Sequence, residues 1–326
     1  MALLIIIGGV FFMSNIQVRI NGRGNAWPVV LGQDHPFYDR NNIQDLANAS
    51  CSIIKSDVAN PKVNEIKWDL MIDAGHGTVQ YLLKNCNRIP EALFITHPHI
   101  DHTLGMDWIV QSYVKLYKKK YPVYTTNPCW DIIKNTFPQL EKLVDFRELI
   151  PFQTTKINEI EESTVTTYPV YHGSSAIGAS MLLFQIREKT QTVKTLFTGD
   201  ILCPLLRKED YDVMQNVDLL VCDANNRFPY PKSNHWSIIE GKDGQQSKYL
   251  KDFINESSMG TLLSPHLKNI SFESYSRCFD YFLNCEYHPD EFHFTAESFI
   301  KAIKPKKVAF LHYSGSEDEK YYKSKI

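Results

Sequence analysis

The chain has 326 residues, of which 43% are hydrophobic and 22% charged, and its formal net charge is −2. This balance is typical of a globular protein that buries a core without disulfide bonds, and it excludes a general basic field, so a polyanion would need a local patch. The seven cysteines are scattered without a Cys-x-x-Cys pair, which argues against a thiolate zinc site and favours reduced thiols in the cytoplasm.

The segment 1–12 is almost wholly apolar. No Lys or Arg precedes it, no convincing cleavage site follows it, and a dozen residues are too few to span a bilayer. We interpret it as an apolar tail or as the product of a mis-assigned start ahead of Met13, with export or membrane anchoring as the alternative. No other segment approaches the length of a membrane span.

In chain order, the apolar pattern predicts an alternation of strands and helices. The first half gives strands at Asn15–Ile20, Ser50–Lys55, Lys67–Ile72, Ala92–Thr96 and Val123–Thr125, and helices at Thr78–Asn85, Thr103–Tyr117 and Trp130–Thr136. The second half gives strands at Ser163–Tyr171, Ala179–Arg187, Val193–Thr198, Leu219–Cys222, Met259–Leu263 and Lys307–Leu311, and helices at Ser247–Asn255 and Ala296–Ile303.

This mixture predicts an α/β (α+β) fold in which sheets pack together and helices lie outside. Residues 13–326 are expected to form a single domain. The stretch 241–289 carries no recognisable motif and is a candidate insertion.

A cluster of ligand-type residues follows the strand Ala92–Thr96. His97, His99, Asp101 and His102 lie within six residues. Imidazole nitrogen and carboxylate oxygen are good ligands for zinc and similar divalent ions, whereas four such side chains are a poor choice for packing. In an extended loop His97 and His99 share one side, and Asp101 and His102 at the next helix start can face a second ion.

The cluster resembles the His-x-His-x-Asp-His signature of the metallo-β-lactamase superfamily, whose fold is a four-layer αββα sandwich. Further family motifs occur in order along the chain. Asp73 resembles the aspartate that braces the metal loop, His172 the third ligand of the first metal, Asp200 the aspartate that bridges both metals, and His312 a ligand of the second metal. His266, which also follows an apolar strand, is an alternative to His312.

The resemblance implies a hydrolase with two divalent metal ions, Zn²⁺ or alternatively Mn²⁺. Two ions that share Asp200 would hold a bridging hydroxide at neutral pH and polarise the group under attack. Asp101 would orient or deprotonate the nucleophile besides binding metal. Asp73 would fix the orientation of the imidazoles.

Three features favour a phosphodiester substrate and resemble the ribonuclease Z and cyclic-nucleotide phosphodiesterase branch. Gly22, Gly24 and Asn25 lie in a glycine-rich loop whose backbone N–H groups would suit an anion. Asp223-Ala224 follows the strand Leu219–Cys222. A histidine that protonates the leaving oxygen is expected before the last helix, and both His235 and His293 match that position.

The expected substrate is a small phosphodiester such as a cyclic nucleotide, because the basic runs 115–120 and 304–307 are short and no long basic arm clamps RNA. The alternatives are a ribonuclease Z-like RNA endonuclease, a lactone, thioester or β-lactam hydrolase, an iron-dependent redox protein, and a non-catalytic metal-binding module. We expect no membrane partner, and a homodimer is a further expectation from the family.

Overall fold

The structure is a computed structural model of the chain. It describes residues 5–6, 10–13, 15–25, 41–58, 61–173, 175–188, 191–230, 233–249 and 294–312. Most of the candidate insertion, 250–289, lies outside the described residues, as do the strand expected at Met259–Leu263, most of the helix expected at Ser247–Asn255, and both His266 and His293.

The first sheet has seven strands in the order β2-β3-β4-β5-β6-β7-β8. They are β2 (Val10–Met13), β3 (Ile16–Gly22), β4 (Ser50–Ser56), β5 (Ile66–Ile72), β6 (Ala92–Phe94), β7 (Tyr121–Thr125) and β8 (Val144–Glu148). The strands β2 to β5 are antiparallel neighbours, and β5 to β8 run parallel to one another. The carboxyl ends of β5 and β6 therefore lie at the same edge of this sheet.

The second sheet has the order β1-β15-β14-β12-β11-β10-β13, and β9 pairs with β10. These strands are β1 (Ile5–Ile6), β9 (Thr154–Lys156), β10 (Ser163–Tyr171), β11 (Ser180–Glu188), β12 (Gln191–Phe197), β13 (Cys203–Pro204), β14 (Leu219–Asp223) and β15 (Val308–Leu311). The strands β12, β14 and β15 are parallel neighbours. The strand β11 is antiparallel to both β12 and β10, so β10 runs in the same direction as β12.

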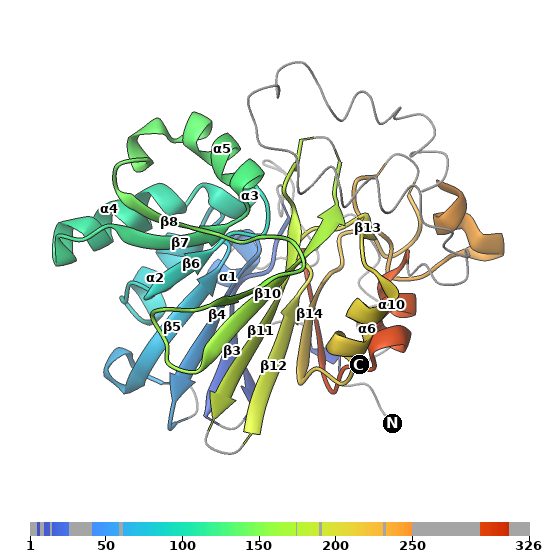
Figure 1. Cartoon of the computed structure of the whole chain (residues 1–326), viewed down its shortest axis with the longest axis horizontal. Helices are drawn as coiled ribbons and strands as arrows, with labels where there is room; N and C mark the ends of the chain where they lie inside the picture. Colours follow the sequence, from blue (N-terminus) through green and yellow to red (C-terminus); the bar gives the residue numbers. More distant parts are fainter. Residues whose placement is uncertain are drawn as a thin grey trace.

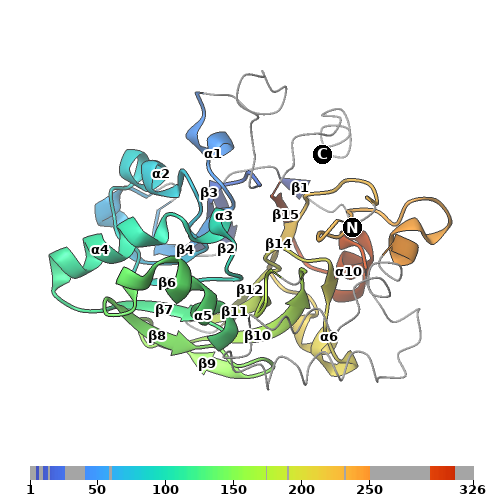
Figure 2. The same cartoon turned by 90° about the horizontal axis from the view of Figure 1, so that it is seen from above.

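Helices cover the outer faces of both sheets (Figure 1). On the first sheet they are α1 (Ile43–Leu46), α2 (Thr78–Asn85), α4 (Met106–Tyr117) and α5 (Asn127–Thr136), and on the second α6 (Lys208–Met214) and α10 (Ala296–Ile303). The one-turn helix α3 (Ile100–Thr103) follows β6 at the edge of the sheet. The view from above shows α2 and α4 on the side away from α6 and α10 (Figure 2). The predicted four-layer αββα arrangement is confirmed.

The core has three parts that match these layers. One buried apolar cluster fills the space between the sheets and includes Ile20, Leu70, Phe94, Phe184, Leu219 and Ala309. A second lies under α2, α4 and α5, and a third lies under α6 and α10. Burial of this apolar surface holds the two sheets face to face and so fixes the strand ends that carry the site.

The segment 1–12 differs from the expected tail. Ile5–Ile6 pairs in parallel with β15, and Val10–Met13 pairs antiparallel with β3. Phe11 belongs to the core between the sheets and is 2% exposed. The segment therefore contributes an edge strand to each sheet. A short apolar run without periodicity does not distinguish such buried strands from an unpaired tail.

Other differences are local. The helix expected at Thr103–Tyr117 is two helices, α3 and α4, interrupted at Leu104 and Gly105. The strands β8 and β9 and the helix α6 were not predicted. No helix among the described residues is long and apolar enough to cross a membrane.

Candidate metal centre

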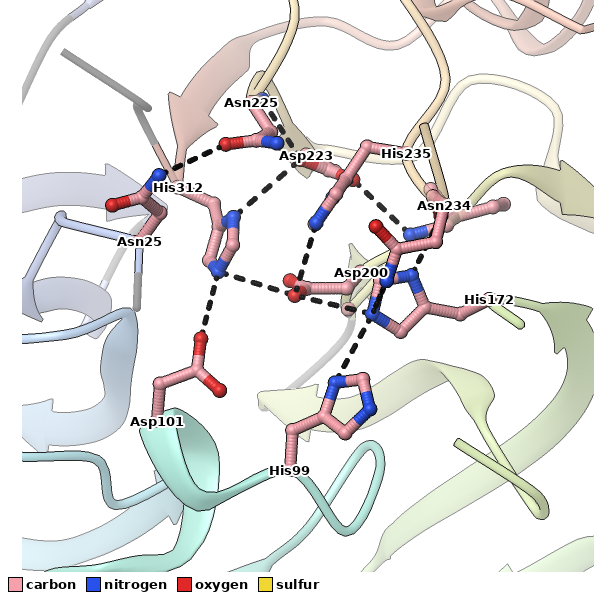
Figure 3. Close-up of polar contacts among 12 residues, drawn as sticks. Asn25, His99, Asp101, His172, Asp200, Asp223, Asn225, Asn234, His235 and His312 are labelled. Atoms are coloured by element: carbon pink, nitrogen blue, oxygen red, sulfur yellow. Dashed lines mark hydrogen bonds and ion pairs between the residues drawn. The ribbon is translucent and has the colours of Figure 1, made fainter. Parts of the chain in front are cut away.

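The predicted ligands lie where strands end at one edge of the two packed sheets. Asp73 follows β5, the segment His97–His102 follows β6, His172 follows β10, Asp200 follows β12, Asp223 ends β14, and His312 follows β15. Parallel strands present their carboxyl ends at the same edge, so residues as far apart in sequence as Asp73 and His312 meet in one place. Figure 3 shows His99, His172, His235 and His312 arranged around Asp200.

The first cluster contains His97, His99 and His172, whose ligand nitrogens lie within 4.8 Å of one another. Nδ1 of His99 and Nε2 of His172 are 3.3 Å apart. This distance matches the roughly 3.3 Å that separates two nitrogens bound to a tetrahedral zinc ion at about 2.0–2.1 Å each.

The second cluster contains Asp101, His102, Asp200 and His312. Oδ2 of Asp200 lies 3.3 Å from His102 Nε2 and 3.1 Å from His312 Nε2. The same oxygen lies 3.6 Å from Nε2 of both His97 and His172, which belong to the first cluster. Asp200 therefore faces both clusters at once, which is the geometry that a bridging carboxylate needs.

The outward nitrogens of the histidines are held by other groups. His102 Nδ1 donates to Asp73 Oδ2 at 2.9 Å, and His172 Nδ1 donates to the carbonyl oxygen of Asn234 at 2.7 Å. His97 Nδ1 lies 3.1 Å from Oγ1 of Thr96, whose hydroxyl donates to Asp73 Oδ2 at 2.8 Å. Because the outward nitrogens carry the protons, the inward Nε2 atoms present lone pairs, as metal ligands require.

His99 is oriented differently from the other histidines. Its Nε2 lies 2.9 Å from the exposed Ser175 Oγ, so its Nδ1 faces the cluster. Ser175, Thr96 and Asn234 were not predicted from the sequence. Ser175 and Asn234 lie in loops that follow β10 and β14, and a backbone carbonyl such as that of Asn234 has no sequence signature.

Two properties of the donor set fit a metal ion. The Nε2 atoms of His97 and His102 are buried and have no hydrogen-bond partner among the described residues, as suits nitrogens that would bind an ion. Burial and the neighbouring His102 keep the pKa of His97 well below its usual range, which leaves the neutral, ligating form.

The carboxylates of the second cluster and Asp73 stabilise positive charge at this site. Burial lowers the pKa of His102, but Asp200, Asp73 and Asp101 together raise it well above its usual value. Burial raises the pKa of Asp200, yet the neighbouring His102, His312 and His97 hold it well below its usual range. An ionised carboxylate surrounded by imidazoles is a suitable place for a divalent cation.

His235 also enters the site. Its Nδ1 donates to Asp223 Oδ2 at 2.8 Å, and its Nε2 lies 3.9 Å from Asp200 Oδ2. Burial lowers the pKa of His235, but the charge and hydrogen bond of Asp223 outweigh burial and raise it. Asp223 is itself held by the backbone N–H groups of Ile201 and Asn225. Of the two histidines considered as the acid, His235 lies at the site, and His293 lies outside the described residues.

The glycine loop contacts both its neighbouring segment and a predicted ligand. The N–H groups of Arg23 and Gly24 donate to the carbonyls of Gln44 and Ala47, so these groups are not free to bind an anion. Instead, the carbonyl of Arg23 accepts the N–H of His312 at 2.9 Å. The backbone beside Gly22 passes so close to Asn48 and Ala47 that a side chain would not fit. The loop positions a predicted ligand of the second cluster.

Asn25 links the two halves of the fold. Its Nδ2 donates to Oδ1 of Asn225 at 3.2 Å, and its carbonyl accepts from Asn48. Figure 3 shows the pair beside His312 and Asp223. The two asparagines thus lie beside the second cluster, and their amides bond to each other across the boundary between the sheets.

Residues 69–248, more than half of the chain, match the family described as the beta-lactamase superfamily domain, and the chain belongs to this family. No relative was found among curated protein sequences. Solved structures show the shared fold. A diphosphatase from the PhnP family has a TM-score of 0.60 at 14% identity, with 95% of this chain and 92% of that chain covered.

Two further structures have the same fold. The metallo-β-lactamase fold protein YhfI from Bacillus subtilis has a TM-score of 0.52 at 12% identity. The matched region covers 95% of this chain and 90% of the YhfI chain. A long-form RNase Z from yeast has a TM-score of 0.52 at 14% identity. The matched region covers 92% of this chain but only 38% of the RNase Z chain. The expected metallo-β-lactamase fold is thereby confirmed.

Asp73 holds histidines of both clusters, which leads to a first prediction. Asp73→Asn keeps the shape of the side chain, and asparagine tolerates the left-handed φ of 57° at this position. Asp73 accepts hydrogen bonds on both oxygens, from the backbone N–H and the hydroxyl of Thr96 and from His102, whereas the NH2 group of an amide cannot accept. At least one of these bonds is therefore lost, and we expect metal affinity to fall about 10- to 100-fold. Competition with a chelating dye measures this affinity. Asp57→Asn, at an exposed carboxylate, is the control, and equal affinities for all three proteins would contradict the role of Asp73.

Proposed function

We propose that this chain is a dinuclear metal-dependent phosphodiesterase that hydrolyses a small phosphodiester such as a cyclic nucleotide. The observation that carries the proposal is the hydrogen-bonded pair of His235 and Asp223, which forms a third group of possible ligands with Asp200 and His312 beside the first and second clusters. A poor leaving group such as an alkoxide needs a proton as its bond to phosphorus breaks, and a histidine with a raised pKa supplies one.

Each group has a defined part in this proposal. His97, His99 and His172 would hold one ion, His102 and His312 with Asp101 the second, and Asp200 would bridge them. When bound, two Zn²⁺ or Mn²⁺ ions lower the pKa of a water molecule toward neutrality and polarise a phosphoryl oxygen. His102 and His312 keep Asp101 ionised by lowering its pKa despite burial, so its carboxylate can accept a hydrogen bond from the nucleophile and orient it.

His235 supplies the proton at the other end of the reaction. Its Nδ1 proton is engaged by Asp223, so the proton for the leaving oxygen is carried by Nε2, which faces the site. The proton passes from Nε2 to the leaving oxygen, and Asp223 stabilises the charged imidazole beforehand. The structures described as a diphosphatase and as an RNase Z support phosphoryl chemistry.

We further propose that the protein forms a homodimer and is located in the cytoplasm.

The function is tested with two diesters that differ in leaving group. Wild-type protein loaded with Zn²⁺ or Mn²⁺ is expected to hydrolyse both bis-p-nitrophenyl phosphate and a 3′,5′-cyclic nucleotide. His235→Ala should lower kcat for the cyclic nucleotide by about 10²–10⁴-fold, because its alkoxide leaving group needs the acid. Nitrophenolate is a stable leaving group, so turnover of bis-p-nitrophenyl phosphate should fall far less.

Asp101→Ala is the control that should abolish both activities. Equal losses for both diesters in His235→Ala would contradict the role of His235 as the acid. Turnover of only a lactone or nitrocefin by the wild-type protein would support a carbonyl hydrolase and overturn the proposal. Absence of turnover with every substrate in a metal-loaded protein would favour a non-catalytic metal-binding module.

One observation favours RNA as a second candidate substrate. A groove beside α4 is lined by five lysines, and Trp108 at this groove is 53% exposed. The lysines are Lys115, Lys118, Lys119, Lys120 and Lys142. Within the described residues none of them forms an ion pair with a carboxylate. Lysines beside an exposed aromatic ring suit phosphates and a stacked base of a single strand.

The groove gives a separate prediction. If RNA binds there, a variant with Lys115, Lys118, Lys119 and Lys120 changed to Gln should bind single-stranded RNA at least about tenfold more weakly, with a salt slope smaller by about 0.7 per lysine lost. Fluorescence anisotropy at several salt concentrations measures both. The control changes Lys301 and Lys306, which pair with Glu297 and Asp218, to Gln. RNA binding that is equal in both variants would exclude this groove.

A further inference from the structure

Asn234 is fixed beside the first cluster by its backbone. Its carbonyl oxygen accepts the Nδ1 proton of His172 at 2.7 Å, and its Cβ lies over Gly173, where a substituent would approach it to 3.6 Å. The residue is half-buried and directly precedes His235. Two neighbouring residues of one loop therefore reach the site, one through its ring and one through its amide.

The side-chain amide of Asn234 points its nitrogen into the site. Nδ2 lies 3.4 Å from Nε2 of His172 (Figure 3). Because His172 Nδ1 already carries a proton for the Asn234 carbonyl, Nε2 has a lone pair, and only the amide nitrogen, not its oxygen, is compatible with it. At 3.4 Å this contact is at the long end of hydrogen bonding, so it holds the amide weakly.

Metal binding would change the partner of this amide. The Nε2 lone pair of His172 is the one that its cluster offers to an ion. Once it is used, the Nδ2 protons of Asn234 no longer have His172 as an acceptor and face the space where a ligand of the cluster would lie. A neutral donor in that place suits an oxygen anion, because the surrounding carboxylates repel anions and the imidazoles present lone pairs.

We infer that Asn234 is a substrate-binding residue whose amide donates a hydrogen bond to a non-bridging oxygen of a phosphoryl group. This inference rests on the proposed function. In the proposed reaction, His235 donates a proton to the leaving oxygen. Asn234 donates a hydrogen bond to an oxygen that remains bonded to phosphorus. A phosphodiester has such an oxygen beyond one that would bind a metal ion and one that leaves, whereas the single carbonyl oxygen of a lactone would itself be polarised by a bound ion. Asn234 therefore favours phosphoryl over carbonyl substrates.

The test separates substrate binding from metal binding. Zinc-loaded wild-type protein, Asn234→Ala and Asn234→Ser are titrated with inorganic phosphate by calorimetry, and metal content and KM for the diester are measured in parallel. Asn234→Ala should weaken phosphate binding and raise KM about 10- to 100-fold, the range for a hydrogen bond to a charged group, with metal content unchanged. Asn234→Ser keeps a small hydrogen-bond donor, so its phosphate affinity and its KM should lie between those of wild type and Asn234→Ala.

Ser175→Ala is the contrasting variant, because Ser175 contacts the outward nitrogen of His99. It should lower metal affinity and leave phosphate affinity at saturating metal within about twofold of wild type. Phosphate affinity that is unchanged in Asn234→Ala, or metal that is lost from it, would overturn the role of Asn234 while the proposed function stands. A wild-type protein that neither binds phosphate nor hydrolyses a diester would overturn both.

Discussion

The structure depends on a single buried carboxylate. Oδ2 of Asp200 lies between 3.1 and 3.9 Å from nitrogens of five histidines, and its side chain is 3% exposed. An isolated carboxylate at this depth would be costly, because burial disfavours its charged form. The imidazoles remove that cost, and Asp200 in turn collects histidines that come from both sheets.

The backbone is shaped to bring those groups together. Asp73 and His312 both adopt left-handed φ values, 57° and 66°, at the positions that directly follow β5 and β15. Gly199, with φ of 59°, lets the turn before Asp200 approach Thr96 so closely that a Cβ atom would lie 2.8 Å from the Thr96 Cβ. Such conformations persist where the surrounding structure fixes them, and here the packed sheets and the hydrogen bonds of Asp73 do so.

Local patterns in the sequence were sufficient for the strand ends and for the cluster at His97–His102, because four ligand-type side chains lie within six residues there. Contacts between distant segments were not predictable. The sequence of the glycine loop suggests an anion site, but the N–H groups of Arg23 and Gly24 donate to the carbonyls of Gln44 and Ala47, some 20 residues later. The roles of Asn234 and Ser175 depend on the fold, since a carbonyl and an exposed hydroxyl have no pattern of their own. Likewise, burial of Phe11 depends on strand pairing that a short apolar run does not reveal.

The central claim is that Asp200 joins two metal sites into one centre, and counting the ions tests it most directly. Purified protein is saturated with zinc, freed of unbound metal, and analysed by inductively coupled plasma and native mass spectrometry. The account predicts two ions per wild-type chain and a loss of bound metal in Asp200→Ala, because that change removes the oxygen that faces both clusters. One ion or fewer per wild-type chain, or full metal content in Asp200→Ala, would contradict it.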